Sequence, residues 1–163
     1  MIGKTFGAST NFERGFTDQE NWHRKFAFQM HTSAELAMQS AIMKNQDFSP
    51  VVIFVRSNGY LVISAGEYTT NENTKDMLAD ELHDAAKKSD IIGILMINDC
   101  RLRRSPNDPD FEDAIFTNAQ WRDGSDLSII TKYVKKSDIE TEFKAPEVPI
   151  YDLVIGRFSN FFR

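Results

Sequence analysis

Carboxylate side chains are concentrated in the stretch DCRLRRSPNDPDFEDAI, which runs from Asp99 to Ile115, and in the turn that follows it. Two or three carboxylates that converge on one point can hold a divalent cation and activate a water molecule. The candidates are Asp99, Asp108, Asp110, Glu112, Asp113, Asp123 and Asp126. Their spacing does not match the Asp-x-Asp-x-Asp-Gly calcium loop. A metal-dependent hydrolase that uses the carboxylates of residues 99–126 is therefore one of two hypotheses for the function.

Arginines accompany these carboxylates and indicate a binding surface instead. The predicted contact residues are Arg101, Arg103, Arg104, Asp108, Asp110, Trp121 and Arg122. Arginines beside a tryptophan can hold single-stranded nucleic acid, but the interspersed carboxylates and a net charge of −5 disfavour a polyanionic partner. We therefore expect a protein partner and no nucleic acid, with these residues on a charged loop between two strands.

The histidines and the one cysteine suggest no catalytic centre. His23 and His31 are separated by about 12 Å along a helix, too far to bind one ion together, and each is predicted to be a surface or boundary residue. His83 has aspartates at helical spacing and could act as a general acid, although a solvated helix face explains the same residues. Cys100 follows a buried strand and is predicted to be a core or boundary residue. We predict no catalytic residue, no metal ligand and no cofactor.

Three of the thirteen phenylalanines close the chain. Phe158, Phe161 and Phe162 lie between Arg157 and Arg163. An aromatic terminus of this kind must either dock on its own domain or be buried in another chain. Because aromatic residues and arginine are favoured in interface cores, this segment is the predicted homodimer contact if part of it is exposed.

A long helix and a hairpin are expected before the charged stretch. The helix begins at Thr17, its predicted N-cap, and runs to about Asn45. Its buried stripe is predicted to contain Trp22, Phe26, Met30, Ala34, Ala37 and Ala41. The run VVIFVRSNGYLVIS then predicts a hairpin around Asn58-Gly59, whose first strand is apolar on both faces and must be covered on both.

The second half predicts a helix followed by strands. The helix begins near Asn73 or Thr74, and IIGILMI after it is a buried strand. The buried side of this helix is predicted to contain Met77, Leu78, Leu82, Ala85 and Ala86. Residues 99–114 are predicted to be a long charged connection to a hairpin that turns at Asp123-Gly124. The final IYDLVIGRFSNFF is either a strand or a terminal helix. The order helix, two strands, helix, three strands and a terminal element favours an α+β domain, with helices packed on a mostly antiparallel sheet of about five strands.

This order resembles the roadblock, longin and profilin-like group of folds, small three-layer modules that often act as dimerising adaptors. The motif SPNDPDFED at residues 105–113, with the later Asp-Gly turn, also resembles small uncharacterised proteins of bacteria and their phages. The second resemblance covers a minor part of the chain and implies no activity.

Length and composition limit the number of domains and the class of protein. A chain of 163 residues, 41% hydrophobic and 26% charged, fits one globular domain, here residues 1–163 with a loose lead-in at residues 1–15. No apolar stretch reaches the length of a membrane helix, the N-terminus lacks the apolar core of a secretory signal, and one cysteine fits a reducing compartment. We expect a cytoplasmic protein-interaction or adaptor module, which a phage or mobile element could encode.

Overall fold

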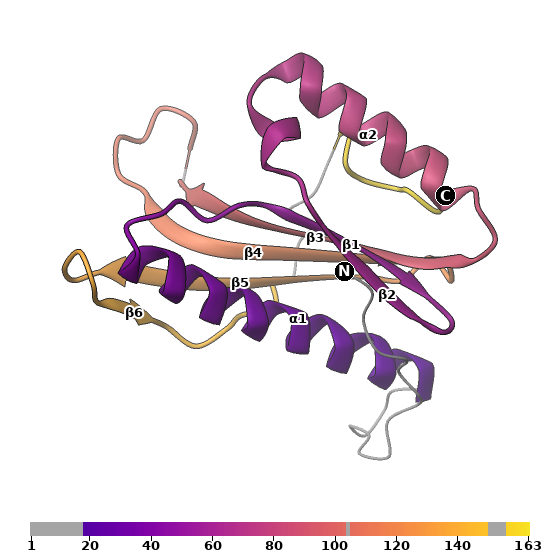
Figure 1. Ribbon diagram of the computed structural model, residues 1–163, viewed down its shortest axis with the longest axis horizontal. Helices are drawn as coiled ribbons and strands as arrows, with labels where there is room; N and C mark the ends of the chain where they lie inside the picture. The colour runs from indigo at the N-terminus through magenta and orange to yellow at the C-terminus, as the bar shows by residue number, and fades with distance from the viewer. Residues whose placement is uncertain (1–17, 104, 150–155) are drawn as a thin grey trace.

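The computed structural model describes residues 18–103, 105–149 and 156–163, and within these ranges it confirms the predicted α+β class. Two α-helices lie on opposite faces of one antiparallel sheet of six strands (Figure 1). The elements are α1 (Asp18–Met43), β1 (Val51–Arg56), β2 (Gly59–Ser64), the 3-10 helix η1 (Gly66–Thr69), α2 (Glu72–Ala86), β3 (Ile91–Leu102), β4 (Glu112–Trp121), β5 (Asp126–Lys135) and β6 (Thr141–Phe143). The predicted lead-in and the Thr17 cap lie outside the described residues.

The strands are ordered β2-β1-β3-β4-β5-β6 across the sheet. Both predicted hairpins are present, β1–β2 and β4–β5. In the first, Arg56 pairs with Gly59, so the loop begins one residue earlier than predicted. In the second, Gly124 has a φ of +90°, a conformation that favours glycine. Strand β6 is not among the five expected strands. It has only three residues in a polar stretch, and so short a segment has no recognisable alternation of apolar and polar residues.

The connection predicted at residues 99–114 is shorter than expected. Backbone pairing between β3 and β4 continues from Asp99 opposite Ile115 to Leu102 opposite Glu112. The charged composition predicts a loop here, but a strand that extends beyond its covering helix can carry charged residues on its solvated face. The loop between β3 and β4 is therefore confined to residues 103–111.

Helix α1 covers one face of the sheet and builds the first hydrophobic core. The buried apolar members of this core are Phe26, Ala27, Ala34, Met38, Ile42, Ile53, Val55, Leu95, Ile97, Ile115, Ala119, Trp121, Ile129 and Tyr133. The predicted stripe is correct for Phe26 and Ala34 but wrong for Ala37, which is exposed. The observed buried face of α1 is rotated relative to the predicted stripe because it includes His31, which is fully buried. A pattern of apolar residues does not include a histidine.

Helix α2 covers the opposite face. Asn71 caps it, one residue before the predicted start, in a reciprocal capping box with Thr74. The second core consists of Val52, Ala65, Leu78, Leu82, Ala86, Ile91, Ile94, Met96 and Phe161. Strand β1 contributes to both cores, as its two apolar faces predicted. No described helix combines the length and the apolar character that a membrane span needs.

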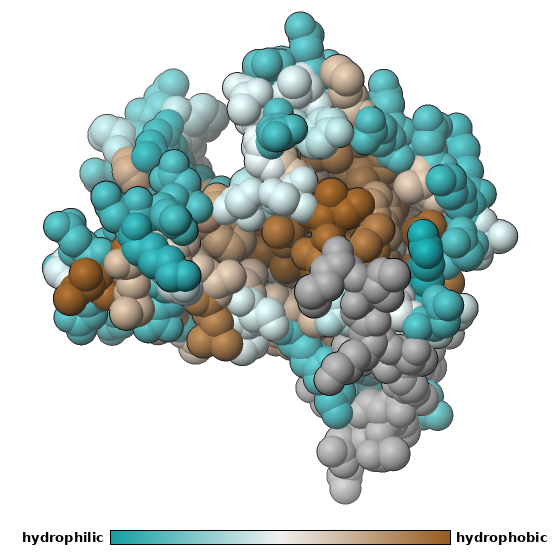
Figure 2. All heavy atoms as spheres, in the orientation of Figure 1, coloured by the Kyte–Doolittle hydropathy of each residue, from teal (hydrophilic) through white to brown (hydrophobic). Residues whose placement is uncertain are grey.

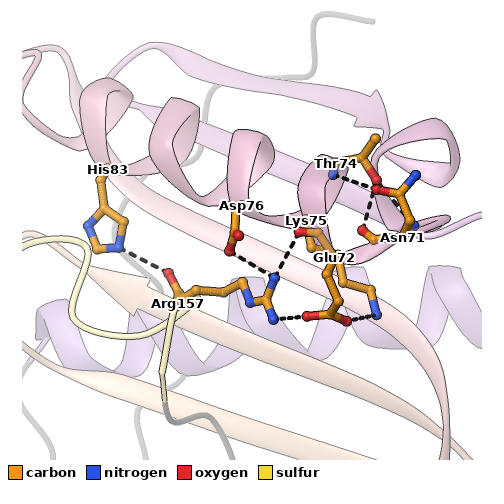
Figure 3. A network of polar contacts seen from close by, with 7 residues as sticks. All are labelled: Asn71, Glu72, Thr74, Lys75, Asp76, His83 and Arg157. Atoms are coloured by element: carbon orange, nitrogen blue, oxygen red, sulfur yellow. Dashed lines mark hydrogen bonds and ion pairs between the residues drawn. The ribbon is translucent and has the colours of Figure 1, made fainter.

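The C-terminal segment, residues 156–163, lies against α2. It consists of turns and is neither the strand nor the helix expected, and residues 150–155 lie outside the described part. Figure 3 shows how Arg157 binds this helix: its guanidinium pairs with Glu72 and Asp76, and its carbonyl oxygen accepts a hydrogen bond from His83 Nε2 at 3.1 Å. The segment therefore docks on its own domain.

The terminal phenylalanines follow the same arrangement. Phe161 is only 5% exposed, and Phe158 and Phe162 pack half-buried against the second core. The Gln120 side chain fixes the backbone from both sides, since its Nε2 donates to the Phe158 carbonyl and its Oε1 accepts from the Phe161 amide. Of the two alternatives for these residues, the structure has the docking on their own domain, which leaves Phe158 and Phe162 partly exposed. A homodimer contact through that exposed part stays a prediction.

Candidate functional site

The predicted carboxylates do not converge on one point. Within the described ranges, no group of three or more histidine, cysteine or acidic side chains is placed to hold a metal ion. Asp99 instead accepts a hydrogen bond from the Tyr133 hydroxyl at 2.7 Å. Burial raises the pKa of Asp99, and burial together with this carboxylate raises the pKa of Tyr133. Asp108 closes a turn by accepting the Asp110 amide at 2.9 Å. These contacts stabilise strand ends and turns.

Two of the predicted arginines do form a cluster, around a phenylalanine that was not predicted. The guanidinium carbon of Arg101 lies 4.5 Å from the centre of the Phe111 ring, and that of Arg103 lies 5.7 Å from it. Arg101 and Arg103 share one face of the chain because they are two residues apart, and the pairing of Leu102 with Glu112 places Phe111 opposite Arg103. We call Arg101, Arg103 and Phe111 the arginine tip.

The arginine tip is exposed at one end of the sheet. Both arginines are exposed, and Phe111 keeps 42% of its surface exposed. Arg101 lies at the end of β3, and the β3–β4 loop that follows projects from the sheet and is separated from α2 in the view of Figure 1. Among the described residues, neither arginine forms an ion pair, although Arg101 is near enough to Asp99 to oppose the rise in that pKa. Arg104, the third predicted arginine, lies outside the described residues.

Trp121 is buried, contrary to the prediction, whereas Arg122 is exposed and binds backbone carbonyls. Trp121 is 1% exposed and belongs to the first core, where the His23 ring stacks on it at 3.9 Å. The Arg122 guanidinium donates to the carbonyl oxygens of Ala86, at 2.7 Å, and Lys88, at 2.6 Å, and its Nε donates to Ile91 at 2.8 Å. It therefore joins the β4–β5 turn to the end of α2, and no stacking surface remains for a ligand.

Replacement of Arg122 should destabilise the domain. The Arg122→Lys variant keeps the positive charge but loses the fork that reaches several carbonyls, so we expect about 2 kcal/mol less free energy of unfolding. Arg56→Lys is the matched control, because Arg56 makes one exposed pair with Asp90 at 3.5 Å, and we expect a change below about 0.5 kcal/mol there. Urea denaturation measures both. Equal effects would contradict the structural role of Arg122.

A cavity of about 150 Å³ lies where the first turns of α1 meet the β4–β5 turn. It is lined by Glu20, His23, Arg24, Trp121, Ser125, Asp126 and Leu127. Ser125 and Asp123 both approach the same nitrogen of His23, Nδ1, at 3.5 and 3.7 Å, and the serine hydroxyl donates to Asp123 at 2.6 Å. In a catalytic triad the serine nucleophile and the orienting acid bind different nitrogens of the histidine base, so this group is not one.

The prediction of a surface or boundary position is wrong for His31. It is fully buried, not a surface residue, and both ring nitrogens lie 2.7 Å from a threonine hydroxyl, Nδ1 from Thr117 and Nε2 from Thr131. Thr131 in turn donates to Glu35 at 3.0 Å. A hydroxyl that donates to Glu35 must accept from His31, so the ring carries its proton on Nε2 and accepts from Thr117 at Nδ1. Burial lowers the pKa of His31 to about 4, and the ring is neutral near pH 7.

Helix α2 carries a second surface of distinct character. Figure 2 shows apolar atoms gathered where α2 meets the sheet and hydrophilic side chains along the outer side of the helix. The large apolar residues that remain exposed on α2 and β2 are Met77, at 56%, and Ile63, at 39%. Asp80 and Glu81 follow Met77 at helical spacing and are exposed. We call Met77, Asp80 and Glu81 the acidic ridge.

Comparison with family models, curated proteins and solved structures found no match for this chain. Its own side chains therefore have to support any proposal about function. Of the two exposed clusters, the arginine tip includes residues that the sequence indicates. In the acidic ridge the prediction is wrong for Met77, which was expected on the buried side of α2 and is exposed. The position of Phe111 could have been predicted from the sequence. If β3 and β4 are extended so that the loop between them is shorter, Phe111 comes to lie opposite Arg103.

Proposed function

We propose that this chain is a protein-interaction module and that the arginine tip is its contact surface. The observation that supports this most directly is the arrangement of Arg101 and Arg103 against the exposed ring of Phe111. Arginine and aromatic residues dominate the binding energy of protein interfaces. The two guanidiniums are already ordered on the ring, so less side-chain entropy is lost when a partner binds.

The chemistry of the tip favours a partner with carboxylates around an apolar side chain. Each guanidinium can form paired hydrogen bonds with a carboxylate while its other face remains on the Phe111 ring. The ring itself offers apolar area at the centre of the contact. A cytoplasmic location and a phage origin remain part of the proposal. No described cluster favours the alternative, a metal-dependent hydrolase.

Capture of partners from the native host tests the module. The Arg101→Gln/Arg103→Gln and Phe111→Ala variants should bind the captured partner at least about tenfold more weakly than the unaltered chain, because each removes part of the interface centre. Their free energies of unfolding should change by less than about 0.5 kcal/mol, since the residues are exposed. The affinity is measured with the purified partner by calorimetry.

The Lys44→Gln/Lys144→Gln variant is the matched control. It removes two positive charges at exposed positions that do not belong to the tip. We expect it to retain the affinity of the unaltered chain to within about twofold, because rim and remote charges contribute little at physiological salt. Equal loss in the tip and control variants would contradict the proposal and indicate only a general effect of net charge.

A further inference from the structure

The two exposed clusters of this chain are complementary to each other. At the arginine tip, an exposed phenylalanine is flanked by two guanidiniums. At the acidic ridge, exposed Met77 is flanked by Asp80 and Glu81. Methionine sulfur and aromatic rings attract one another, and arginines pair with carboxylates, so each part of one cluster has a counterpart on the other.

The acidic ridge has carboxylates to offer a partner. Asp84 pairs with Lys87 at 3.3 Å, and Asp76 pairs with Arg157 at 2.9 Å. Asp80 and Glu81, in contrast, form no ion pair among the described residues. The ridge therefore presents one apolar side chain and two carboxylates that are not already neutralised, which is the chemistry that the tip would recognise.

Among the described residues of one molecule, no ion pair joins the two clusters. The β3–β4 loop lies beyond one end of the sheet, and α2 lies over another part of it (Figure 1). A symmetric dimer through either cluster would bring like charges together, arginines against arginines or carboxylates against carboxylates. The remaining arrangement joins the tip of one copy to the ridge of the next.

We propose that copies of this chain associate head to tail, with Arg101, Arg103 and Phe111 of one copy bound to Met77, Asp80 and Glu81 of another. This proposal rests on the proposed function and names a second copy as the partner of the tip. Two copies that bind each other reciprocally, tip to ridge twice, close as a dimer. If each copy instead binds two different neighbours, the assembly adds copies until it closes into a ring or grows as a filament.

Sedimentation velocity of the full chain tests this assembly. The average mass should rise with protein concentration above that of the monomer, and added salt should reduce it because the contact depends on charge. The Arg101→Gln/Arg103→Gln variant, which lacks the tip, and the Asp80→Asn/Glu81→Gln variant, which lacks the ridge, should each associate at least about tenfold more weakly.

Mixing the two variants gives the decisive result. The intact ridge of the first and the intact tip of the second can form one contact, so the mixture should contain dimers and nothing larger. The Asp138→Asn/Glu140→Gln variant, which removes two exposed carboxylates elsewhere, should assemble like the unaltered chain.

Three outcomes would overturn the proposal: a chain that stays monomeric, variants that assemble normally, or a mixture that forms no dimer. If the tip variants lose the host partner but the unaltered chain is monomeric, only the head-to-tail contact is overturned, and the proposed function stands. Tip variants that still bind every host partner, together with normal self-association, would overturn both the contact and the proposed function.

Discussion

Replacement of Gly93 by alanine should reduce the free energy of unfolding by about 3 kcal/mol or more. Gly93 lies on β3 directly opposite Trp121 on β4. The Cβ that alanine adds would lie 2.4 Å from Cε3 and 2.6 Å from Cζ3 of the indole, closer than any ordinary carbon contact. The smallest possible side chain therefore overlaps the ring of the largest residue in the core.

Three rings of α1 hold the Trp121 ring in place. His23 stacks on it with a centroid separation of 3.9 Å, and Trp22 and Phe26 meet it edge-on at 5.4 and 6.0 Å. These rings belong to α1, so a shift of Trp121 would displace the helix from the sheet. A tightly packed interior transmits such strain instead of absorbing it, and this is why the expected loss is large for one methyl group.

A double-mutant cycle with Trp121→Leu identifies the cause. Trp121→Leu alone should cost about 3 to 5 kcal/mol through the cavity that it leaves. The Gly93→Ala/Trp121→Leu double variant should be less destabilised than the sum of the single changes, because the atoms that Cβ would overlap are absent. Urea denaturation followed by circular dichroism measures all four proteins. Additive effects would show that Gly93 is needed for a reason other than the indole.

The sequence predicted those parts of the fold that depend on local pattern. Apolar alternation and turn residues located both hairpins, and the apolar faces of β1 required a layer on each side. The length of β3 could not be predicted in the same way. Asp99 and Arg101 lie on the strand because β4 pairs with them, and pairing across a loop is not encoded in the local composition of either strand.

The candidate site was predicted only in part for a related reason. Arg101 and Arg103 were recognised by residue type, and their position beside Phe111 depends on the register of β3 with β4. Trp121 and Arg122 were assigned to a surface because a tryptophan and an arginine next to a turn resemble a ligand platform. The packing of α1 and the open carbonyls at the end of α2 account for both residues instead.

Replacement of His31 by leucine should reduce the free energy of unfolding near pH 7 by about 2 to 3 kcal/mol. The imidazole accepts the hydroxyl of Thr117 and donates to Thr131, and all three side chains are fully buried. Leucine fills a similar volume but leaves Thr117 without its partner in a region that water does not reach. Thr131 still donates to Glu35, so the Thr117 hydroxyl is the main group that loses its hydrogen bond.

The difference in free energy of unfolding between the unaltered chain and the His31→Leu variant should become smaller as the pH falls. The pKa of His31 is lowered from 6.5 to about 4, so below pH 6.5 the unfolded chain takes up a proton that the folded chain does not. The stability that neutral His31 supplies is complete above pH 6.5 and is lost as the pH falls toward 4. Near pH 5 the unaltered chain should have lost about 2 kcal/mol that the leucine variant does not lose.

Glu35 opposes this trend and has to be separated from it. Burial raises the pKa of Glu35, so its contribution to stability decreases as the pH rises above the ordinary value for glutamate. Both proteins contain Glu35, and the difference between their unfolding free energies at each pH isolates His31 as long as the Glu35 pKa is the same in both. Denaturation of the Glu35→Gln and His31→Leu/Glu35→Gln pair over the same pH range checks that condition.

Removal of the whole hydrogen-bonded group should be milder than removal of its centre. In the His31→Leu/Thr117→Val/Thr131→Val variant, no buried hydroxyl is left unpaired, and valine has nearly the shape of threonine. We expect this triple variant to be more stable than His31→Leu alone and to lack the stability change between pH 6.5 and 4 that His31 causes. A triple variant less stable than the single one would mean that the threonines stabilise the packing of α1 by contacts other than the histidine.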